Sequence, residues 1–146
     1  MYFVGLIAFL FFLVCSALIS TTLSHFIDMP SIVIILAFSI SMLMASGLFP
    51  DFLRGFKIIG EKVNTWSIIE LKKTEIALEL MIKLLLLSGL LGSLIGLVSI
   101  LANLNDLSKL GPCIGVSALS FLYSVVIVFI LLPVKAKVNA IIQTME

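Results

Sequence analysis

Residues 84–133 read LLLLSGLLGSLIGLVSILANLNDLSKLGPCIGVSALSFLYSVVIVFILLP, two apolar runs joined by a polar turn over 103–112. As helices, the runs 84–102 and 113–133 would each be about 30 Å long, which is enough to cross a bilayer. A helix that meets only lipid gains nothing from small residues on one side, so a stripe of them predicts close packing or a lined pathway. The first run carries such a stripe at Gly89, Gly92, Ser93 and Gly96, and the second at Cys113, Ser117, Ser120 and Ser124.

The composition sets the class of protein. Of the 146 residues, 62% are hydrophobic and 12% are charged, and the mean hydropathy is +1.32. These values predict an all-α integral membrane protein rather than a soluble domain. We expect a single membrane domain over 1–146, with four spans near 2–19, 32–49, 84–102 and 113–133 and a charged segment over 50–83.

The basic residues are distributed unevenly along the chain. Six of the nine lie in 50–83, two follow the fourth span, and only Lys109 lies in the turn between the third and fourth spans. The positive-inside rule therefore predicts that both termini and 50–83 are cytoplasmic and that Asp28 is outside. Within 50–83 we expect an amphipathic helix, and then a second helix that begins near Ile68 and continues into the third span.

Several functional classes find no support in the sequence. The formal net charge of +1 gives no indication of a nucleic-acid partner. No nucleophile with a base, phosphate-binding loop or metal-ligand cluster is recognisable, so we expect neither an enzyme nor a bound cofactor.

Asp28 opens the second predicted span, and two interpretations remain open for it. It can be the N-cap of that helix, with Pro30 in the first turn. It can also be a carboxylate at the mouth of a pore, where it would attract cations. His25, a few residues earlier, is either a proton carrier or ordinary solvated polarity at the membrane surface.

Four short motifs carry a resemblance to a known family. They are IDMPS at 27–31, LGSLIGL at 91–97, the turn 103–112 that ends in Gly-Pro, and ALSFLY at 118–123 followed by Leu132-Pro133. Together they resemble the MotA/TolQ/ExbB family, most closely its MotA branch, whose third helix reads like GTxxGL and whose fourth carries an ALxTxYG-like motif. The segment 50–83 is about a third as long as the rotor-engaging insertion of flagellar members. The sequence FSI at 38–40 replaces a GGT-like pair.

The resemblance implies an assembly and a set of site residues. It implies a homopentamer in the bacterial inner membrane, around a MotB/ExbD/TolR-like partner with a single span and an intramembrane Asp. The first family threonine corresponds to Ser93, whereas the second position is Phe121, with Ser120 just before it. The transported cation would be a proton or sodium. The expected ion-pathway residues are Asp28, Ser93, Ser117, Ser120 and Ser124, and those for helix packing and partner contact are Gly89, Gly92, Gly96, Tyr123 and Pro133.

The apolar cores of the four predicted spans contain no Asp, Glu, Lys, Arg or His. A proton relay through hydrocarbon needs a titratable group, so either this chain conducts nothing or another polypeptide supplies the carboxylate. The second option is what the resemblance implies, and the resemblance therefore favours an ion-conducting ring subunit of a motor or stator complex. The alternative is a structural four-span scaffold, in which each serine bonds its own helix and permits tight packing.

Overall fold

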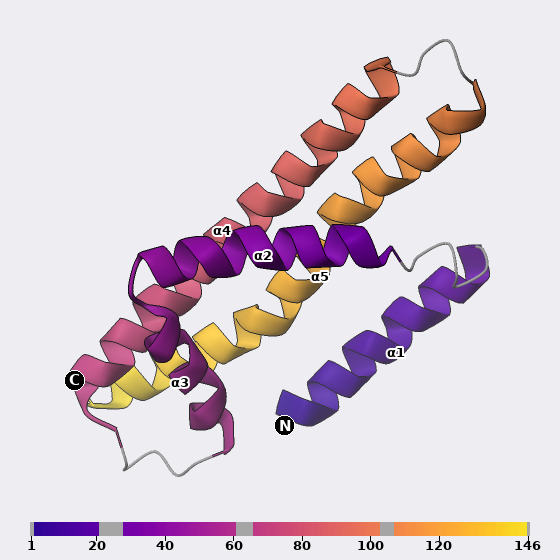
Figure 1. Ribbon diagram of the computed structural model, residues 1–146. Coiled ribbons are helices and arrows are strands. Elements are labelled where there is room, and N and C mark those ends of the chain that lie inside the picture. The colour runs from indigo at the N-terminus through magenta and orange to yellow at the C-terminus, as the bar shows by residue number, and fades with distance from the viewer. Residues whose placement is uncertain (1, 21–27, 61–65, 103–106, 146) are drawn as a thin grey trace.

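The computed structural model describes residues 2–20, 28–60, 66–102 and 107–145. They form five helices: α1 (Tyr2–Ser20), α2 (Met29–Ala45), α3 (Phe49–Gly60), α4 (Ile68–Ala102) and α5 (Leu107–Met145). The long helices α4 and α5 make an antiparallel hairpin, α2 lies obliquely across it, and α3 packs near one end (Figure 1). The expected all-helical architecture is therefore confirmed for the described residues.

The start of α4 is fixed by a capping box. The Ser67 hydroxyl accepts a hydrogen bond from the Glu70 backbone N–H at 3.3 Å, and the Glu70 carboxylate accepts one from the Ser67 N–H at 3.0 Å. This reciprocal pair satisfies two backbone donors that a helix start leaves open. The helix then runs without interruption from Ile68 to Ala102, which confirms the expected continuous helix into the third apolar run.

The hairpin is held by close contact between glycines of α4 and serines of α5, which we call the glycine–serine seam. A Cβ atom on Gly92 would lie 2.9 Å from Ser120 Cβ, and one on Gly96 would lie 2.6 Å from Ser117 Cβ. A Cβ on Gly89 would overlap the Ser124 hydroxyl. Only glycine leaves room for this approach, so the stripes of α4 and α5 face each other within one chain. The seam comprises Gly89, Gly92, Gly96, Ser117, Ser120 and Ser124.

Helix α2 packs against the hairpin with one narrow face. Its buried residues, Ser31, Ile35, Ser39 and Leu43, recur every fourth position, the spacing of one helix face. The Ser39 hydroxyl donates to the Ser88 hydroxyl of α4 at 3.0 Å, a buried bond between the two helices.

The second apolar helix ends earlier than expected. We expected it to continue to residue 49, but α2 ends at Ala45, and Gly47 takes a left-handed conformation with φ of +73°. Glycine adopts this conformation without steric cost. The next helix, α3, is bent by 110° relative to α2.

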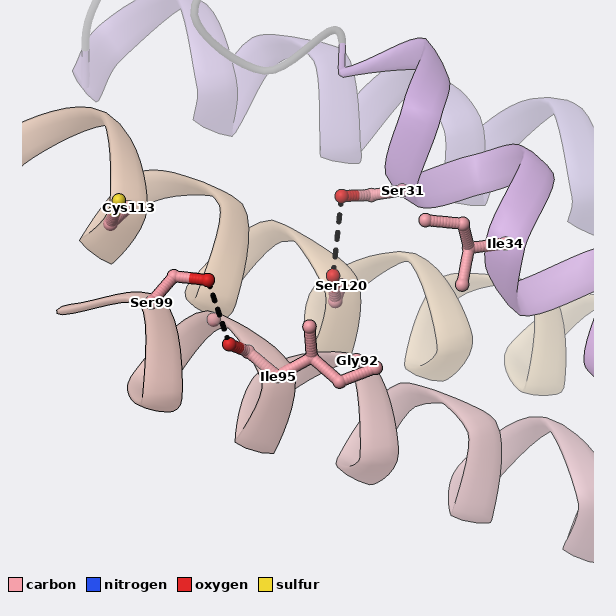
Figure 2. A pocket seen from close by; sticks show the side chains of 8 residues that line it. Ser31, Ile34, Gly92, Ile95, Ser99, Cys113 and Ser120 are labelled. Atoms are coloured by element: carbon pink, nitrogen blue, oxygen red, sulfur yellow. Dashed lines mark hydrogen bonds between the residues drawn. The ribbon is translucent and has the colours of Figure 1, made fainter. Parts of the chain in front are cut away.

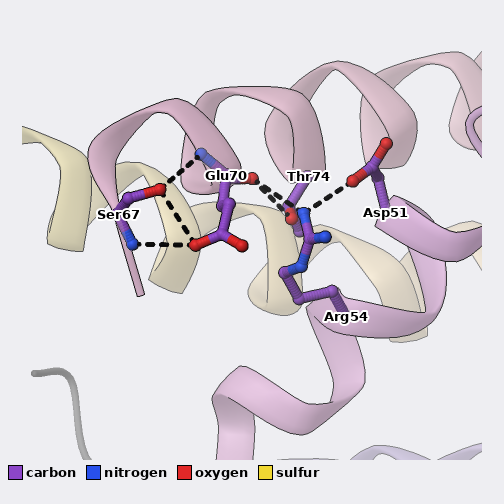
Figure 3. A network of polar contacts seen from close by, with 5 residues as sticks. All are labelled: Asp51, Arg54, Ser67, Glu70 and Thr74. Carbon is purple, nitrogen blue, oxygen red and sulfur yellow. Dashed lines mark hydrogen bonds and ion pairs between the residues drawn. The ribbon is translucent and has the colours of Figure 1, made fainter. Parts of the chain in front are cut away.

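Charged residues gather where α3 meets the hairpin. We call this region the basic end. Arg54 pairs with Asp51 at 2.6 Å and donates to the Glu70 carbonyl at 3.3 Å, which ties α3 to α4 (Figure 3). Lys137 of α5 donates to the carbonyls of Ile58 and Ile59 at 3.2 and 3.0 Å, and so caps the last turn of α3. The described basic residues of this end are Arg54, Lys57, Lys72, Lys73, Lys83, Lys135 and Lys137.

One further expectation needs correction, and others fall outside the described residues. Residues 107–112 were expected in the polar turn, but they are helical, since α5 begins at Leu107. The helix continues past Pro133 to Met145. His25 and the turn residues 103–106 lie outside the described part of the chain.

Among the described residues, two helices are long and apolar enough to cross a membrane: α4, and α5 from Cys113 to Met145. The bent α2–α3 pair makes a third if it counts as one span, and α1 contributes a shorter apolar helix. This gives the chain the character of a membrane-embedded protein.

The seam predicts that Gly96→Ala destabilises the hairpin. The added methyl group would meet Ser117 Cα at 2.8 Å, so the α5 backbone must move away. We expect a loss of about 1–3 kcal/mol in the free energy of unfolding, measured by thermal or denaturant unfolding of the purified protein in detergent. Gly115→Ala is the matched control, since a Cβ there meets nothing within 4 Å. Equal stability of the two variants would contradict the seam.

Candidate functional site

Helices α2, α4 and α5 line an open hollow of about 230 Å³ beside the seam (Figure 2). Its polar groups are hydroxyls and a thiol, and its walls are otherwise apolar or glycine. The Ser99 hydroxyl is turned back to the Ile95 carbonyl of its own helix at 3.0 Å. The hollow is lined by Ser31, Ile34, Gly92, Ile95, Gly96, Ser99, Cys113 and Ser120.

A chain of hydroxyls leads from Asp28 to this hollow. The Ser120 hydroxyl donates to the Ser31 hydroxyl at 3.2 Å, and the Ser31 hydroxyl donates to the Asp28 carboxylate. The Asp28 backbone N–H also donates to the Tyr123 hydroxyl at 2.7 Å. Two serines on different helices therefore connect a carboxylate at the start of α2 with the interior of the bundle. We call Asp28, Ser31 and Ser120 the hydroxyl relay.

The N-cap interpretation of Asp28 holds for its position but not for its side chain. Asp28 occupies the N-cap of α2, with Pro30 in the first turn, yet its carboxylate makes no capping hydrogen bond. It accepts the Ser31 hydroxyl instead. The carboxylate is therefore directed to a side chain that faces the hairpin.

The other serines expected in the ion pathway lie apart from the relay. Ser93 and Ser117 bond each other reciprocally: the Ser93 hydroxyl donates to the Ser117 carbonyl at 2.8 Å, and the Ser117 hydroxyl to the Ser93 carbonyl at 2.9 Å. Ser124 is fully buried against Gly89 and donates to the Phe121 carbonyl of its own helix at 2.7 Å. The structure thus joins Asp28 with Ser120, and separately pairs Ser93 with Ser117.

The residues expected for helix packing and partner contact lie in three different parts of the structure. Gly89, Gly92 and Gly96 lie in the seam, whereas Pro133 lines a different hollow with Tyr2 and Phe9 of α1. Tyr123 approaches the start of α2 through the Asp28 bond.

Ser120, and not Phe121 at the position of the second family threonine, faces the interior. The Phe121 ring is 48% exposed and lines a hollow with Phe9 and Phe129, away from the relay. Ser120 is 3% exposed and faces α2. The hydroxyl that faces the interior therefore belongs to Ser120, one residue before Phe121, where the family motif has its threonine.

Sequence reasoning missed Ser31 as a site residue, and it missed Ser39 and Ser88 as a buried bridge. A signal was present, because Ser31 and Ser39 fall on the same four-residue spacing as Ile35 and Leu43 of the buried α2 face. Their partners, Ser120 and Ser88, are far away in the sequence, and no local sequence pattern predicts which serine each of them contacts.

Chemically, the site offers neutral oxygens beside one carboxylate. Hydroxyl oxygens can replace part of a cation's hydration shell. Among the described residues, no three His, Cys, Asp or Glu side chains come together as a metal site. In comparison with known proteins, the chain matches no family model and no curated protein sequence.

The reciprocal Ser93–Ser117 pair predicts that each of the two hydroxyls stabilises the contact between α4 and α5. Ser93→Ala and Ser117→Ala each remove one hydrogen bond between α4 and α5, at a cost of about 0.6–1.7 kcal/mol in a membrane helix pair. We expect each substitution to lower the thermal midpoint in detergent, while Ser41→Ala, at an exposed position of α2, leaves it unchanged. If the Ser93 and Ser41 variants melt alike, the cross-helix bonds contribute nothing.

Proposed function

We propose that this chain is the ion-conducting ring subunit of a motor or stator-like complex driven by ion-motive force. In this proposal the chain lies in a bacterial inner membrane with both termini in the cytoplasm, and α1, α2, α4 and α5 provide four spans. Five copies surround a partner that has a single membrane helix. The resemblance of the motifs at 27–31, 91–97 and 118–123 to the MotA/TolQ/ExbB family supports this choice.

The observation that carries the proposal is the hydroxyl relay in an otherwise neutral interior. Asp28 is the only carboxylate among the described residues at its end of the bundle, and Ser31 and Ser120 extend its polarity between α2 and α5. A structural helix contact gains little from burying a hydroxyl pair next to a carboxylate, since alanine would fill nearly the same space without a polar group that needs a partner. An ion pathway requires such oxygens.

In the proposed mechanism, the carboxylate that takes up and releases the cation belongs to the partner. The apolar lengths of α2, α4 and α5 carry no charged side chain, so this chain alone offers no titratable carrier at mid-membrane depth. The cation would be attracted by Asp28, pass Ser31 and Ser120, and bind an Asp of a MotB/ExbD/TolR-like helix. Each change of charge on that Asp would favour a new position of the partner within the ring.

A second candidate, a structural four-span scaffold, is favoured by the Ser93–Ser117 pair. Both hydroxyls are used inside the chain, on backbone carbonyls of the neighbouring helix. Such bonds stabilise a helix pair without any transported ion. The scaffold and the ring subunit differ in whether the hydroxyl relay contributes to ion flux.

Ion flux through the complex purified with its partner and reconstituted in vesicles tests the proposal. Ser31→Ala should lower the flux about tenfold or more, because its lost hydrogen bond is to the Asp28 carboxylate and a bond to a charged group is worth about 1.5–3 kcal/mol. Ser120→Ala should lower it about two- to tenfold, because its bond to the Ser31 hydroxyl is neutral and is worth about 0.5–1.5 kcal/mol. Ser41→Ala is the control and should conduct normally. Assembly is checked by the yield of co-purified partner, which should stay the same. Unchanged flux in both relay variants with intact assembly would refute conduction along this path and favour the scaffold.

A further inference from the structure

Helix α3 has an apolar face that the rest of the chain covers only in part. Phe52 and Ile58 are buried against the hairpin, and a Cβ on Gly55 would lie 3.2 Å from Leu78 of α4. On the other side Leu53 is 46% exposed and Phe56 is 42% exposed. A short helix with large apolar side chains on its uncovered face needs a second apolar surface.

The direction of α3 indicates which surface that is. Helix α2 has 17 residues, about 25 Å of helix, which is close to the thickness of the hydrocarbon core. The turn at Gly47 then bends the chain by 110°, so α3 leaves α2 almost at a right angle and cannot continue through the bilayer. If α2 crosses most of the bilayer, α3 lies nearly parallel to its surface.

The level of α3 along α4 agrees with a position among the lipid headgroups. The middle of α3, Gly55, packs at Leu78, one residue before Glu79. Glu79 pairs with Lys83 at 2.7 Å and with Lys135 at 3.1 Å, and this charged group lies just before the apolar run that begins at Leu84. The middle of α3 is therefore level with the boundary between charged and apolar surface, and Arg54 reaches from it toward the charged start of α4, to the Glu70 carbonyl.

Both α2 and α3 expose large apolar side chains. Phe38, Met42 and Met44 of α2 are 43%, 58% and 59% exposed, and Leu53 and Phe56 follow after the bend. The Phe56 ring is held in place by an edge contact with Phe52, with centroids 5.3 Å apart. Beside these apolar side chains, Lys57 is exposed on the same helix.

We propose that α3 is an interfacial anchor that binds the surface of an anionic phospholipid bilayer. Leu53 and Phe56 enter the outer part of the acyl layer, and the Lys57 ammonium lies among phosphate groups. The chemistry is that of an amphipathic helix in the interface plane, with apolar burial and attraction to anionic lipid acting together. The anchor fixes the depth at which the hairpin sits, and it does not depend on whether the chain conducts ions.

The test is the depth of spin labels on the full chain reconstituted in phosphatidylcholine vesicles with phosphatidylglycerol. Single cysteines replace Leu53 or Phe56 in a chain with Cys15→Ala and Cys113→Ala, and collision rates are measured with oxygen and with a water-soluble nickel chelate. Met42→Cys, on the exposed face of α2, is the control for lipid contact. Ile69→Cys, 67% exposed in the first turn of α4, is the control for water.

We expect labels at 53 and 56 to collide more with oxygen than with the chelate, as at 42, and the ratio to invert at 69. Dominant collision with the chelate at 53 and 56 would place α3 in water and overturn the proposal. Low collision with both reagents would indicate cover by another protein chain and would overturn it as well. Lys57→Glu should lower the oxygen-to-chelate ratio at 56 in anionic vesicles but not in phosphatidylcholine alone. An unchanged ratio would remove the anionic lipid from the proposal.

Discussion

The close approach of α4 and α5 is the constraint on which the rest of the structure depends. Gly89, Gly92 and Gly96 leave no side chain between the two backbones, so the serines of α5 sit directly on α4. At this distance a hydroxyl of either helix can reach a carbonyl of the other, as Ser93 and Ser117 do. Without the glycines the helices would separate, and the Ser93 and Ser117 hydroxyls would lose their partners.

The seam also determines what is left for function. Because α4 and α5 use their small faces on each other, the polar surface offered to anything else lies at the edge of the seam, where α2 crosses. Ser31 and Ser120 meet there, and the hollow opens beside them. Charged groups are concentrated at the basic end, and the apolar lengths of the helices remain neutral. With the charges at one end, the apolar lengths of the helices form an uncharged surface whose only polar groups are a few hydroxyl oxygens.

Local signals predicted the elements well, and pairings across the chain poorly. The helix expected from near Ile68 into the third apolar run gave the course of α4, and the spacing of Gly89, Gly92 and Gly96 gave its packing face. The end of α2 was missed because residues 46–49 are as apolar or small as the helix before them, and only the left-handed Gly47 breaks it. The early start of α5 was missed because its first turns contain Gly111-Pro112, a pair that usually lies in a turn rather than within a helix. The Ser31–Ser120 contact could not be foreseen, since it depends on how α2 crosses the hairpin.

The central claim is that this chain forms a neutral wall with a few oxygens and that another polypeptide supplies the carboxylate which carries the cation. The most direct measurement is a high-resolution structure of the assembly isolated from native membranes. The account predicts several copies of this chain around a foreign membrane helix, with a carboxylate of that helix facing the hollow at Ser31 and Ser120. A single copy, or a ring in which only lipid faces that hollow, would contradict it.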